Sequence, residues 1–361
     1  MPPKGAGKGL SKKAAITAFA VTDNGLALAG RLSSIHPDLV VIGPDDIKHG
    51  GLKAAVKEAF SSSKALFFIG ATGIAVRVVA PHLKGKHLDP AVVVMDDGGR
   101  FVISLLSGHL GGANELAREL AAVYGAEPVI TTATDAAGLA CAEDISKAFS
   151  LVIQDPKKIK RVNSAILKGA AVLVIDADRA RLAAIRERFK GAGPFRFRGG
   201  YPASGEFGAV IMITPFEASN VPAAIKDRTL IMRPKEFVLG IGCGMGVSAK
   251  EVRLAVDAAL EKTGVSLLSI RSVATIDIKG SEPGLLRFAS KMGLDINCFS
   301  APELDRIRPP SGRSKIVYGR TGTGSVCESA ALISAGVKRI WLRKQKTGRV
   351  AVALARAPFT S

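Results

Sequence analysis

Short apolar segments alternate with amphipathic segments over the first third of the chain. The apolar segments are residues 14–21, 38–43, 65–70, 91–97 and 127–132. Such runs are typical of strands buried on both faces of a parallel sheet. The stretches 51–60 and 113–125 carry apolar residues at helical spacing. This alternation predicts a doubly wound α/β domain over residues 14–135.

The remaining chain repeats the pattern in two further segments. In the middle segment, residues 136–232, we expect a Lys- and Arg-rich helix at 156–169, a strand at 171–176, a helix at 178–189 and an exposed glycine- and proline-rich loop at 190–208. In residues 233–361 we expect strands at 236–242 and 294–299, helices at 248–263 and 326–336, a glycine-rich loop at 318–325, and closing strands at 339–345 and 349–357. The predicted fold class is therefore α/β, with two Rossmann-like, mainly parallel-sheet units joined by a middle α/β segment.

Composition narrows the class of protein. Aromatic residues make up only 5% of the chain, which disfavours a platform for stacking single-stranded nucleic acid. The four cysteines stand far apart, as expected for reduced thiols in a cytoplasmic protein. No apolar run approaches the ~18 residues that span a bilayer. Residues 1–13 are basic and lack an apolar core, so we expect a flexible tail rather than a signal peptide.

The formal net charge of +19 indicates an anionic partner. Nucleic acid, an anionic membrane surface and a small polyanion would each fit, and so would a proteome that favours basic proteins. Charge alone does not choose among them.

Three glycine-rich turns, residues 108–112, 242–246 and 319–324, are expected between a strand and a helix. Unpaired backbone N–H groups and the helix dipole favour an anion at such a turn. None matches a dinucleotide fingerprint or a phosphate loop. Ordinary turn chemistry explains any one of them, but three in one basic protein favour anion binding.

Polar side chains surround the first turn, which carries His109. They follow the predicted strands and include Asp96, Asp97, Arg100, Thr131, Thr132, Asp135, Thr72, Arg77 and Lys86. Ligands of open parallel sheets bind beyond the carboxyl ends of the strands, so we expect these groups to meet at one edge. The aspartates are equally well explained as turn or helix caps. Neither a metal site nor a serine-hydrolase elbow is predicted.

Several long stretches carry a family resemblance. Residues 67–121, with "SGHLGGANELA" at their centre, and "VITTATD" at 129–135 resemble the amino-terminal domain of the CbiG family, the cobalt-precorrin-5A hydrolases of anaerobic cobalamin biosynthesis. "GIGCGMGVSAKEV", "ATIDIKGSEPGLLRFASKMG" and "GSVCESAALISAG" resemble its carboxyl-terminal domain. The resemblance runs from about residue 65 to the end and is loose in the middle segment.

The resemblance implies an enzyme and its reaction. The substrate is a cobalt-bearing tetrapyrrole with a ring-A lactone, which is opened; a two-carbon fragment leaves as acetaldehyde and cobalt-precorrin-5B remains. Cobalt arrives and leaves with the substrate, so no cofactor of the protein's own is expected. A basic cleft suits the carboxylates on the substrate's rim. We further expect a homodimer, hand-over of the product to other enzymes of the pathway, and no nucleic-acid or membrane partner.

Candidate residues follow from the motifs and the resemblance together. His109 is the expected base or acid, because histidine titrates near neutral pH. Asp96, Asp97 and Asp135 are expected to orient His109 or the attacking water, and Glu115 is either a second base or a partner of the helix dipole. The expected substrate contacts are Thr72, Arg77, Lys86, Arg100, Gly108, Gly111, Gly112, Asn114, Thr131, Thr132, Lys279, Thr321, Gly322, Gly324 and Glu328.

The second turn departs from the family pattern. The family places basic residues directly after the cysteine, where this chain has Gly244 and Met245. If those cations grip substrate carboxylates, this chain must use others, of which Lys250, Arg253 and Lys279 are the candidates.

Other classes of function stay open on the sequence. A corrinoid-binding escort protein without catalysis would share these features. Nucleic-acid binding would explain the charge but lacks a reader motif. A nucleotide-dependent enzyme lacks its fingerprints.

Overall fold

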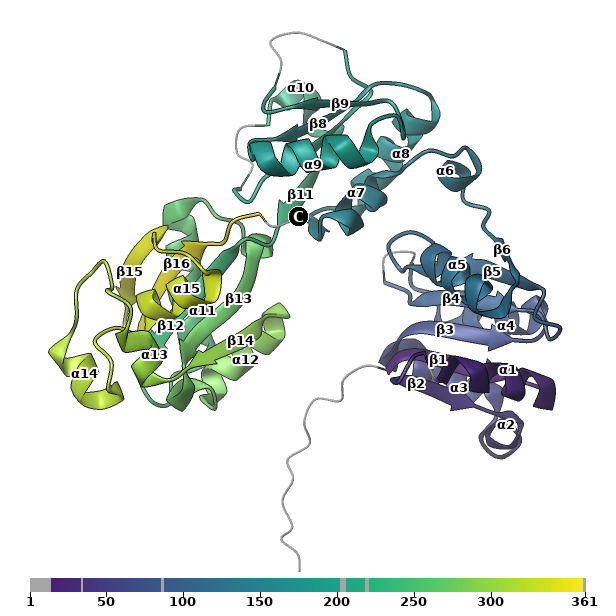
Figure 1. Cartoon of the computed structure of the whole chain (residues 1–361), viewed down its shortest axis with the longest axis horizontal. Coiled ribbons are helices and arrows are strands. Elements are labelled where there is room, and N and C mark those ends of the chain that lie inside the picture. The colour runs from purple at the N-terminus through teal and green to yellow at the C-terminus, as the bar shows by residue number, and fades with distance from the viewer. Residues whose placement is uncertain (1–13, 34, 86–87, 202–205, 218–220, 360–361) are drawn as a thin grey trace, which may run out of the picture. The chain divides into compact units, whose positions relative to one another are not determined.

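The computed structural model describes residues 14–33, 35–85, 88–201, 206–217 and 221–359, so the expected tail of residues 1–13 lies outside the described residues. The chain divides into two compact units, residues 1–139 and 140–361. The first unit contains one sheet and the second contains two (Figure 1). The prediction of α/β units with mainly parallel sheets is confirmed.

The sheet of the first unit has six strands. Their order is β2 (Leu39–Ile42), β1 (Ala14–Ala20), β3 (Ser63–Ile69), β4 (Ala91–Met95), β5 (Phe101–Leu106) and β6 (Glu127–Val129). Helices α1 (Asp23–Ser33) and α5 (Ala113–Tyr124) pack on one face, and α3 (Leu52–Ser62) and α4 (Thr72–Val79) on the other. Shorter helices are α2 (Pro44–Gly50), η1 (Ala80–His82) and α6 (Ala133–Ala136).

Strand β5 reverses the direction of this sheet, and the apolar pattern did not predict it. Strands β1 to β4 are mutually parallel, β5 runs antiparallel to β4, and β6 runs parallel to β5. A tight turn at residues 96–100 joins β4 to β5, with Gly99 at φ 66°. The carboxyl ends of β5 and β6 therefore lie at the edge opposite to the carboxyl ends of β1, β3 and β4.

The second unit begins with a five-stranded sheet, the middle domain. Its order is β7 (Leu151–Ile153), β11 (Thr229–Pro234), β10 (Ala209–Ile213), β8 (Val172–Asp176) and β9 (Phe195–Arg198), with β7 antiparallel to β11. Its helices are α7 (Ala142–Ala148), η2 (Pro156–Lys158), α8 (Ile159–Leu167), α9 (Arg179–Phe189) and α10 (Ala223–Lys226). Strand β9 lies inside residues 190–208, so the prediction of a loop there is wrong at this strand.

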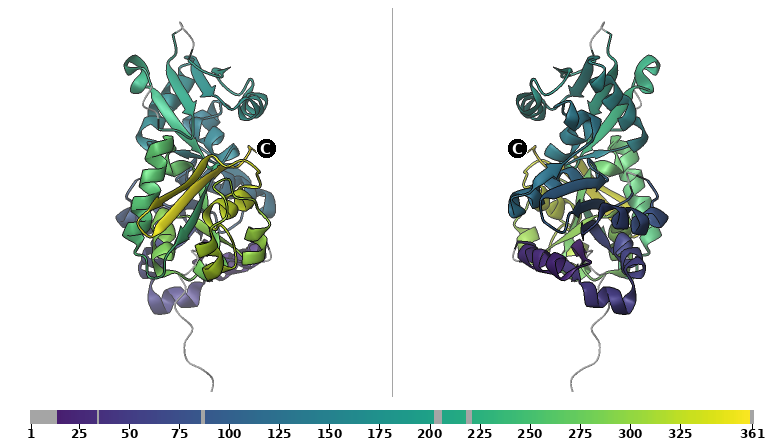
Figure 2. Two further views of the ribbon diagram at one scale, coloured as in Figure 1. Left: turned by 90° about the vertical axis from the view of Figure 1, so that its left-hand side faces the viewer. Right: turned by 90° about the vertical axis from the view of Figure 1, so that its right-hand side faces the viewer.

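The carboxyl-terminal domain is a second five-stranded sheet. Its order is β14 (Asp295–Phe299), β13 (Ile270–Ile276), β12 (Phe237–Cys243), β16 (Val350–Arg356) and β15 (Leu342–Thr347). The closing strands β15 and β16 form an antiparallel hairpin, drawn in yellow in the left view of Figure 2. Helices α11 (Ala249–Thr263) and α12 (Pro283–Met292) pack on one face, and α13 (Ala301–Asp305) and α15 (Cys327–Ala335) on the other. Shorter helices are η3 (Leu267–Ser269), η4 (Asp277–Lys279) and α14 (Lys315–Thr321).

Gly240 allows α15 to lie directly on β12. A Cβ atom at this position would stand 1.8 Å from the carbonyl oxygen of Cys327. We expect Gly240→Ala to lower the free energy of unfolding by about 1–3 kcal/mol, because helix and strand must separate to admit the methyl group. Gly30→Ala is the control: its Cβ would meet nothing within 4 Å inside helix α1, so it should stabilise the protein by about 0.5–1 kcal/mol. Equal urea midpoints for the two variants would contradict this packing.

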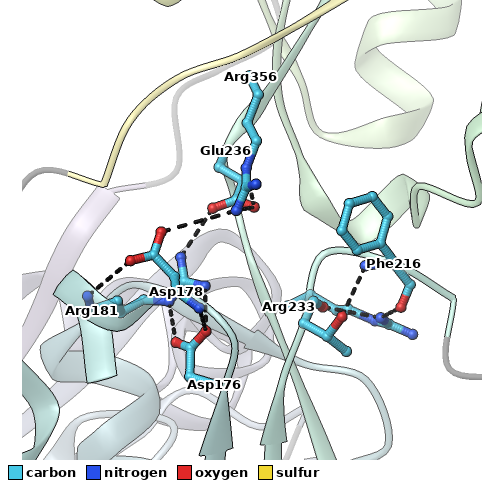
Figure 3. Close-up of polar contacts among 8 residues, drawn as sticks. Asp176, Asp178, Arg181, Phe216, Arg233, Glu236 and Arg356 are labelled. Atoms are coloured by element: carbon cyan, nitrogen blue, oxygen red, sulfur yellow. Dashed lines mark hydrogen bonds and ion pairs between the residues drawn. The ribbon is translucent and has the colours of Figure 1, made fainter. Parts of the chain in front are cut away.

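A buried ion-pair cluster joins the two domains of the second unit (Figure 3). Arg181 of α9 donates from Nε to Asp176 Oδ2 at 2.6 Å and from Nη1 to Glu236 Oε2 at 3.0 Å. Glu236 lies between β11 and β12 and also accepts from Nε of Arg356 at 3.0 Å. Arg181, Asp176 and Glu236 are all buried. The cluster fixes the chain segment where the middle domain passes into the carboxyl-terminal domain.

No helix among the described residues is long and apolar enough to cross a membrane.

Candidate functional site

The His109 turn connects β5 to α5 and depends on close backbone packing. A Cβ on Gly108 would lie 2.5 Å from Oδ1 of Asn114, and a Cβ on Gly111 would lie 2.7 Å from the carbonyl oxygen of Ser107. Gly112 has φ 91°, in the left-handed region that favours glycine. These glycines are therefore required by the turn itself, which holds the backbone of His109 in one place.

The imidazole of His109 faces a carboxylate and a hydroxyl group of α6, the short helix after β6. Its Nε2 lies 3.2 Å from Oγ1 of Thr134 and 3.6 Å from Oδ2 of Asp135. The side chains of His109 and Asp135 are each 18% exposed. A carboxylate beside an imidazole stabilises the protonated ring, which is the arrangement that a general base requires.

A hydrogen-bond network fixes Asp135 at this position. Asn114 donates to Oδ2 of Asp135 at 3.0 Å and to Oγ1 of Thr132 at 3.1 Å, and its own Oδ1 accepts from Ser104 at 2.6 Å. Arg118 donates to Oδ1 of Asp135 at 2.5 Å. Asn114 is only 3% exposed. Its contacts support a positioning role for Asn114 rather than the direct substrate contact expected from the sequence.

The pKa of Asp135 reports the balance of these contacts. Burial acts to raise it, but the hydrogen bonds from Thr132 and Arg118 and the charges of His109 and Arg118 outweigh burial, so the pKa lies below its usual value of 3.8. Asp135 is thus ionised at neutral pH and available to pair with an imidazolium ion.

Replacing Asp135 by asparagine should reduce stability in a pH-dependent way. A carboxyl whose pKa is lowered by folding stabilises the native state above its unfolded pKa, and loses this contribution as the pH falls through the folded value. We therefore expect Asp135→Asn to unfold at lower urea concentration than wild type at pH 7. The difference should shrink as the pH falls below about 4, because Asp135 of the unfolded chain becomes protonated there and the native carboxylate follows at lower pH. Urea unfolding across this range measures it, and a pH-independent difference would contradict the ionised network.

The expected single cluster of polar groups is divided between two edges of the sheet. His109 and Asp135 follow β5 and β6, whereas Asp96, Asp97 and Arg100 form the turn after β4 at the opposite edge. Oδ1 of Asp96 accepts from the amides of Arg100 and Phe101 at 2.8 and 2.7 Å. The expectation that these groups meet His109 is therefore wrong, because β5 reverses direction. Of the two explanations that the sequence left open, turn capping is the one that Asp96 fits.

The other predicted site residues of the first unit are exposed, lie on the Asp96 edge of the sheet, or fall outside the described residues. Thr72 begins α4 after β3, on the Asp96 edge, and exposed Arg77 bonds back to the carbonyl oxygen of Gly73 at 3.2 Å. Lys86 lies outside the described residues. Thr131 is exposed near the His109 turn, and Glu115 is exposed in the first turn of α5.

The amides of the His109 turn differ in availability. The N–H of Gly112 donates to the carbonyl oxygen of His109 at 3.1 Å. Within the ranges that the structure describes, the N–H of Gly111 makes no hydrogen bond. Gly111 is therefore the stronger candidate to donate to an anion.

The second glycine turn follows β12 and is held together internally. The N–H of Gly244 donates to the carbonyl oxygen of Arg349 at 3.0 Å, and the N–H of Gly246 donates to Oε1 of Glu282 at 2.9 Å. The Arg349 guanidinium returns hydrogen bonds to the carbonyl oxygens of Met245 and Gly246 at 3.1 and 3.3 Å. A cation from the β15–β16 hairpin thus sits at the turn whose own sequence lacks one. Arg349 is distant in sequence, so no local motif pointed to it.

The three cations expected to replace the family's basic residues after the cysteine differ in burial and in their ion pairs. Lys279 is mostly buried and bonds to Oε2 of Glu282 at 3.1 Å. Arg253 pairs with Asp257 at 2.7 Å on the surface of α11. Lys250 is exposed near the start of that helix.

The third glycine turn joins two helices, which corrects the prediction of a strand before it. Thr321 is the last residue of α14, and Gly322 caps that helix at φ 72°. The N–H of Gly324 donates to Oδ1 of Asp305 at 3.2 Å. Glu328 is fully buried and accepts from Ser311 and from the amide of Lys344. Its predicted substrate contact is therefore wrong: Glu328 ties a loop and a strand together.

Positive charge is concentrated in the second unit. Residues 1–139 contain 14 Lys and Arg against 12 Asp and Glu, whereas residues 140–361 contain 36 against 19. A polyanion is therefore attracted mainly by the middle and carboxyl-terminal domains.

Comparison with known proteins finds one family match in the first unit and another in the carboxyl-terminal domain. Residues 54–135 match the Cobalamin synthesis G N-terminal family, and residues 237–355 match the Cobalamin synthesis G C-terminus family. The cobalt-precorrin-5A hydrolase of Priestia megaterium is 33% identical over 86% of this chain and 83% of its own length. That of Salmonella typhimurium is also 33% identical, over 90% of this chain and 93% of its own length. The protein CobE of a Sinorhizobium species is 32% identical over 34% of this chain and 81% of its own length.

Proposed function

This chain belongs to the cobalt-precorrin-5A hydrolase family of cobalamin synthesis, and we propose that the His109 turn is its catalytic centre. The protein is a hydrolase of that pathway, and its substrate is cobalt-precorrin-5A. The single observation that carries the site assignment is the pairing of His109 with an ionised Asp135 beside a glycine turn.

The chemistry requires an activated water first. Hydrolysis adds water across the ring-A lactone and gives a carboxylate and a hydroxyl group. In the proposed mechanism His109 takes the proton from water while Asp135 stabilises the resulting imidazolium ion. The N–H of Gly111 donates to the oxygen that becomes negative on the lactone carbonyl. Asn114 and Thr132 keep Asp135 in place.

Fragment release follows from the new hydroxyl group. A base removes its proton, the carbon–carbon bond to the macrocycle breaks, and acetaldehyde leaves. The electron pair of the broken bond remains on the macrocycle, which takes up a proton. His109 is the proposed base of this step too, with Glu115 as the second candidate for proton transfer. The cobalt ion belongs to the substrate, so the proposal includes no cofactor of the protein's own.

The second unit carries most of the net positive charge of the chain. The excess of Lys and Arg there suits a polycarboxylate. The four cysteines are free thiols, which supports a reducing compartment such as the cytoplasm. A homodimer and hand-over of the product to the next enzyme remain parts of the proposal.

The test is an acetaldehyde assay on the purified protein with anaerobically prepared cobalt-precorrin-5A. We expect one acetaldehyde for each tetrapyrrole converted and many turnovers per protein. Tight binding of the tetrapyrrole without acetaldehyde would instead identify an escort protein. Unchanged activity after dialysis against a chelator would support a mechanism without a resident metal ion.

A further inference from the structure

A cavity of about 850 Å³ lies between the middle and carboxyl-terminal domains of the second unit. It is bounded by α9, by the chain between β11 and β12, by the start of β13, and by residues 357–359. Its volume lies in the range of about 300–1,000 Å³ that is usual for small-molecule sites. The proposed catalytic turn belongs to the other unit, so this cavity has no assigned role.

Two charged residues in the lining of the cavity, which we call its floor, are buried and already paired. Arg181 and Glu236 line it, and both belong to the buried ion-pair cluster drawn in Figure 3. Their charges are satisfied by Asp176 and Arg356. The floor residues therefore connect the two domains. Because their charges are already paired, a ligand must be recognised by residues at the rim of the cavity.

The rim carries three exposed cations, Arg188, Lys235 and Arg271. In the part of the chain that the structure describes, none of their side chains makes a hydrogen bond or an ion pair. One rim acid, Glu187, accompanies them. They come from α9, the β11–β12 connection and β13, so three separate elements direct positive charge to one opening. Such an arrangement attracts a ligand with several negative groups.

The walls between floor and rim are partly apolar. Phe149 and Phe359 line the cavity and are both partly buried, and their ring centroids lie 6.1 Å apart. The Arg181 guanidinium lies 5.9 Å from the centroid of the Phe359 ring. An apolar wall below a cationic rim fits a ligand with a flat hydrophobic body and carboxylates at its edge.

We infer that this cavity binds an edge of the tetrapyrrole substrate, with rim carboxylates paired to Lys235, Arg271 and Arg188 and the macrocycle edge against Phe149 and Phe359. The inference rests on the proposed function and adds where the substrate is held.

The test compares two corrinoids with the full-length protein. Cobyrinic acid carries carboxylates where cobinamide carries amides, so the pair isolates recognition of charge. We expect wild type to bind cobyrinic acid more tightly than cobinamide, with an affinity that falls as salt rises. The double variant Lys235→Gln/Arg271→Gln should weaken cobyrinic acid binding about tenfold. Lys291→Gln, an exposed lysine of α12 outside the cavity, is the matched control and should bind as wild type does.

Steady-state kinetics separate failure of this inference from failure of the proposed function. With cobalt-precorrin-5A, the double variant should raise KM about tenfold and leave kcat near the wild-type value. Unchanged KM and unchanged cobyrinic acid binding in a correctly folded double variant would overturn the cavity assignment, while leaving catalysis at His109 intact. Absence of acetaldehyde release by wild type would overturn the proposed function, and this inference with it.

Discussion

Replacing His109 by alanine is expected to lower kcat for acetaldehyde release by about 10²–10⁴-fold, the usual contribution of a positioned general base. The side chain is 18% exposed and contacts Thr134 and Asp135, so its removal takes away the proton acceptor while the turn glycines still fix the backbone. A quenched time course of acetaldehyde formation at saturating substrate measures the effect.

Matched variants separate this loss from a folding defect. His49→Ala removes an exposed imidazole of α2 whose Nδ1 lies 2.7 Å from the carbonyl oxygen of Asp45, and kcat should stay at the wild-type value. His109→Ala should retain the circular dichroism spectrum and tetrapyrrole affinity of wild type. Turnover within about threefold of wild type would remove His109 from the mechanism.

The largest expected effect on stability is at the junction of the middle and carboxyl-terminal domains. Arg181→Ala leaves the buried carboxylates of Asp176 and Glu236 without their shared partner. Breaking a buried ion pair from one side costs about 3–5 kcal/mol, because an uncompensated charge stays in a poorly polarisable interior. Calorimetry should show a large fall in the melting temperature of the transition that involves residues 140–361.

An exposed ion pair provides the comparison. Arg253 and Asp257 pair at 2.7 Å, but both side chains are more than 40% exposed. Arg253→Ala should therefore cost at most about 1 kcal/mol. If Arg181→Ala and Arg253→Ala shift the melting temperature equally, the cluster does not hold the domains together.

Much of the fold follows from local sequence patterns. The strands β1, β3, β4, β8 and β12 are nearly continuous apolar runs, and α5, α8 and α11 show helical spacing. These patterns identify elements because buried strands and amphipathic helices need those residues whatever surrounds them. Strand β9 was not predicted, because its sequence, FRFR, is short, alternates aromatic with charged residues and lies inside a glycine-rich stretch.

Strand direction was the decisive missing information for the site. The turn sequence DDGGR followed by FVISLL is a recognisable hairpin signal between β4 and β5. If this stretch is interpreted as a hairpin, Asp96 and Asp97 are predicted at the sheet edge opposite to His109. Asp135 is then predicted at the same edge as His109. In the Arg181 cluster, Asp176 precedes Arg181 by five residues, but Glu236 and Arg356 lie on distant segments that only the tertiary fold brings to Arg181.

The burial of a polar side chain distinguishes residues that stabilise the fold from residues that could contact a substrate. Asn114 and Glu328 lie in stretches that resemble the family, yet both side chains are buried and their hydrogen bonds are internal. The sequence does not show whether a single polar residue of a helix is buried or exposed. A structural role and a substrate-binding role therefore cannot be told apart until the packing of the helix is known.

The most direct test of the proposed catalytic centre at His109 is a crystal structure of the full-length protein with a cobalt corrinoid bound. We expect the imidazole of His109 to lie within hydrogen-bond distance of the ring-A substituent, with the side chain of Asp135 still next to the imidazole. A bound corrinoid whose ring A points to a different set of acid–base residues, with His109 facing only protein, would contradict the assignment.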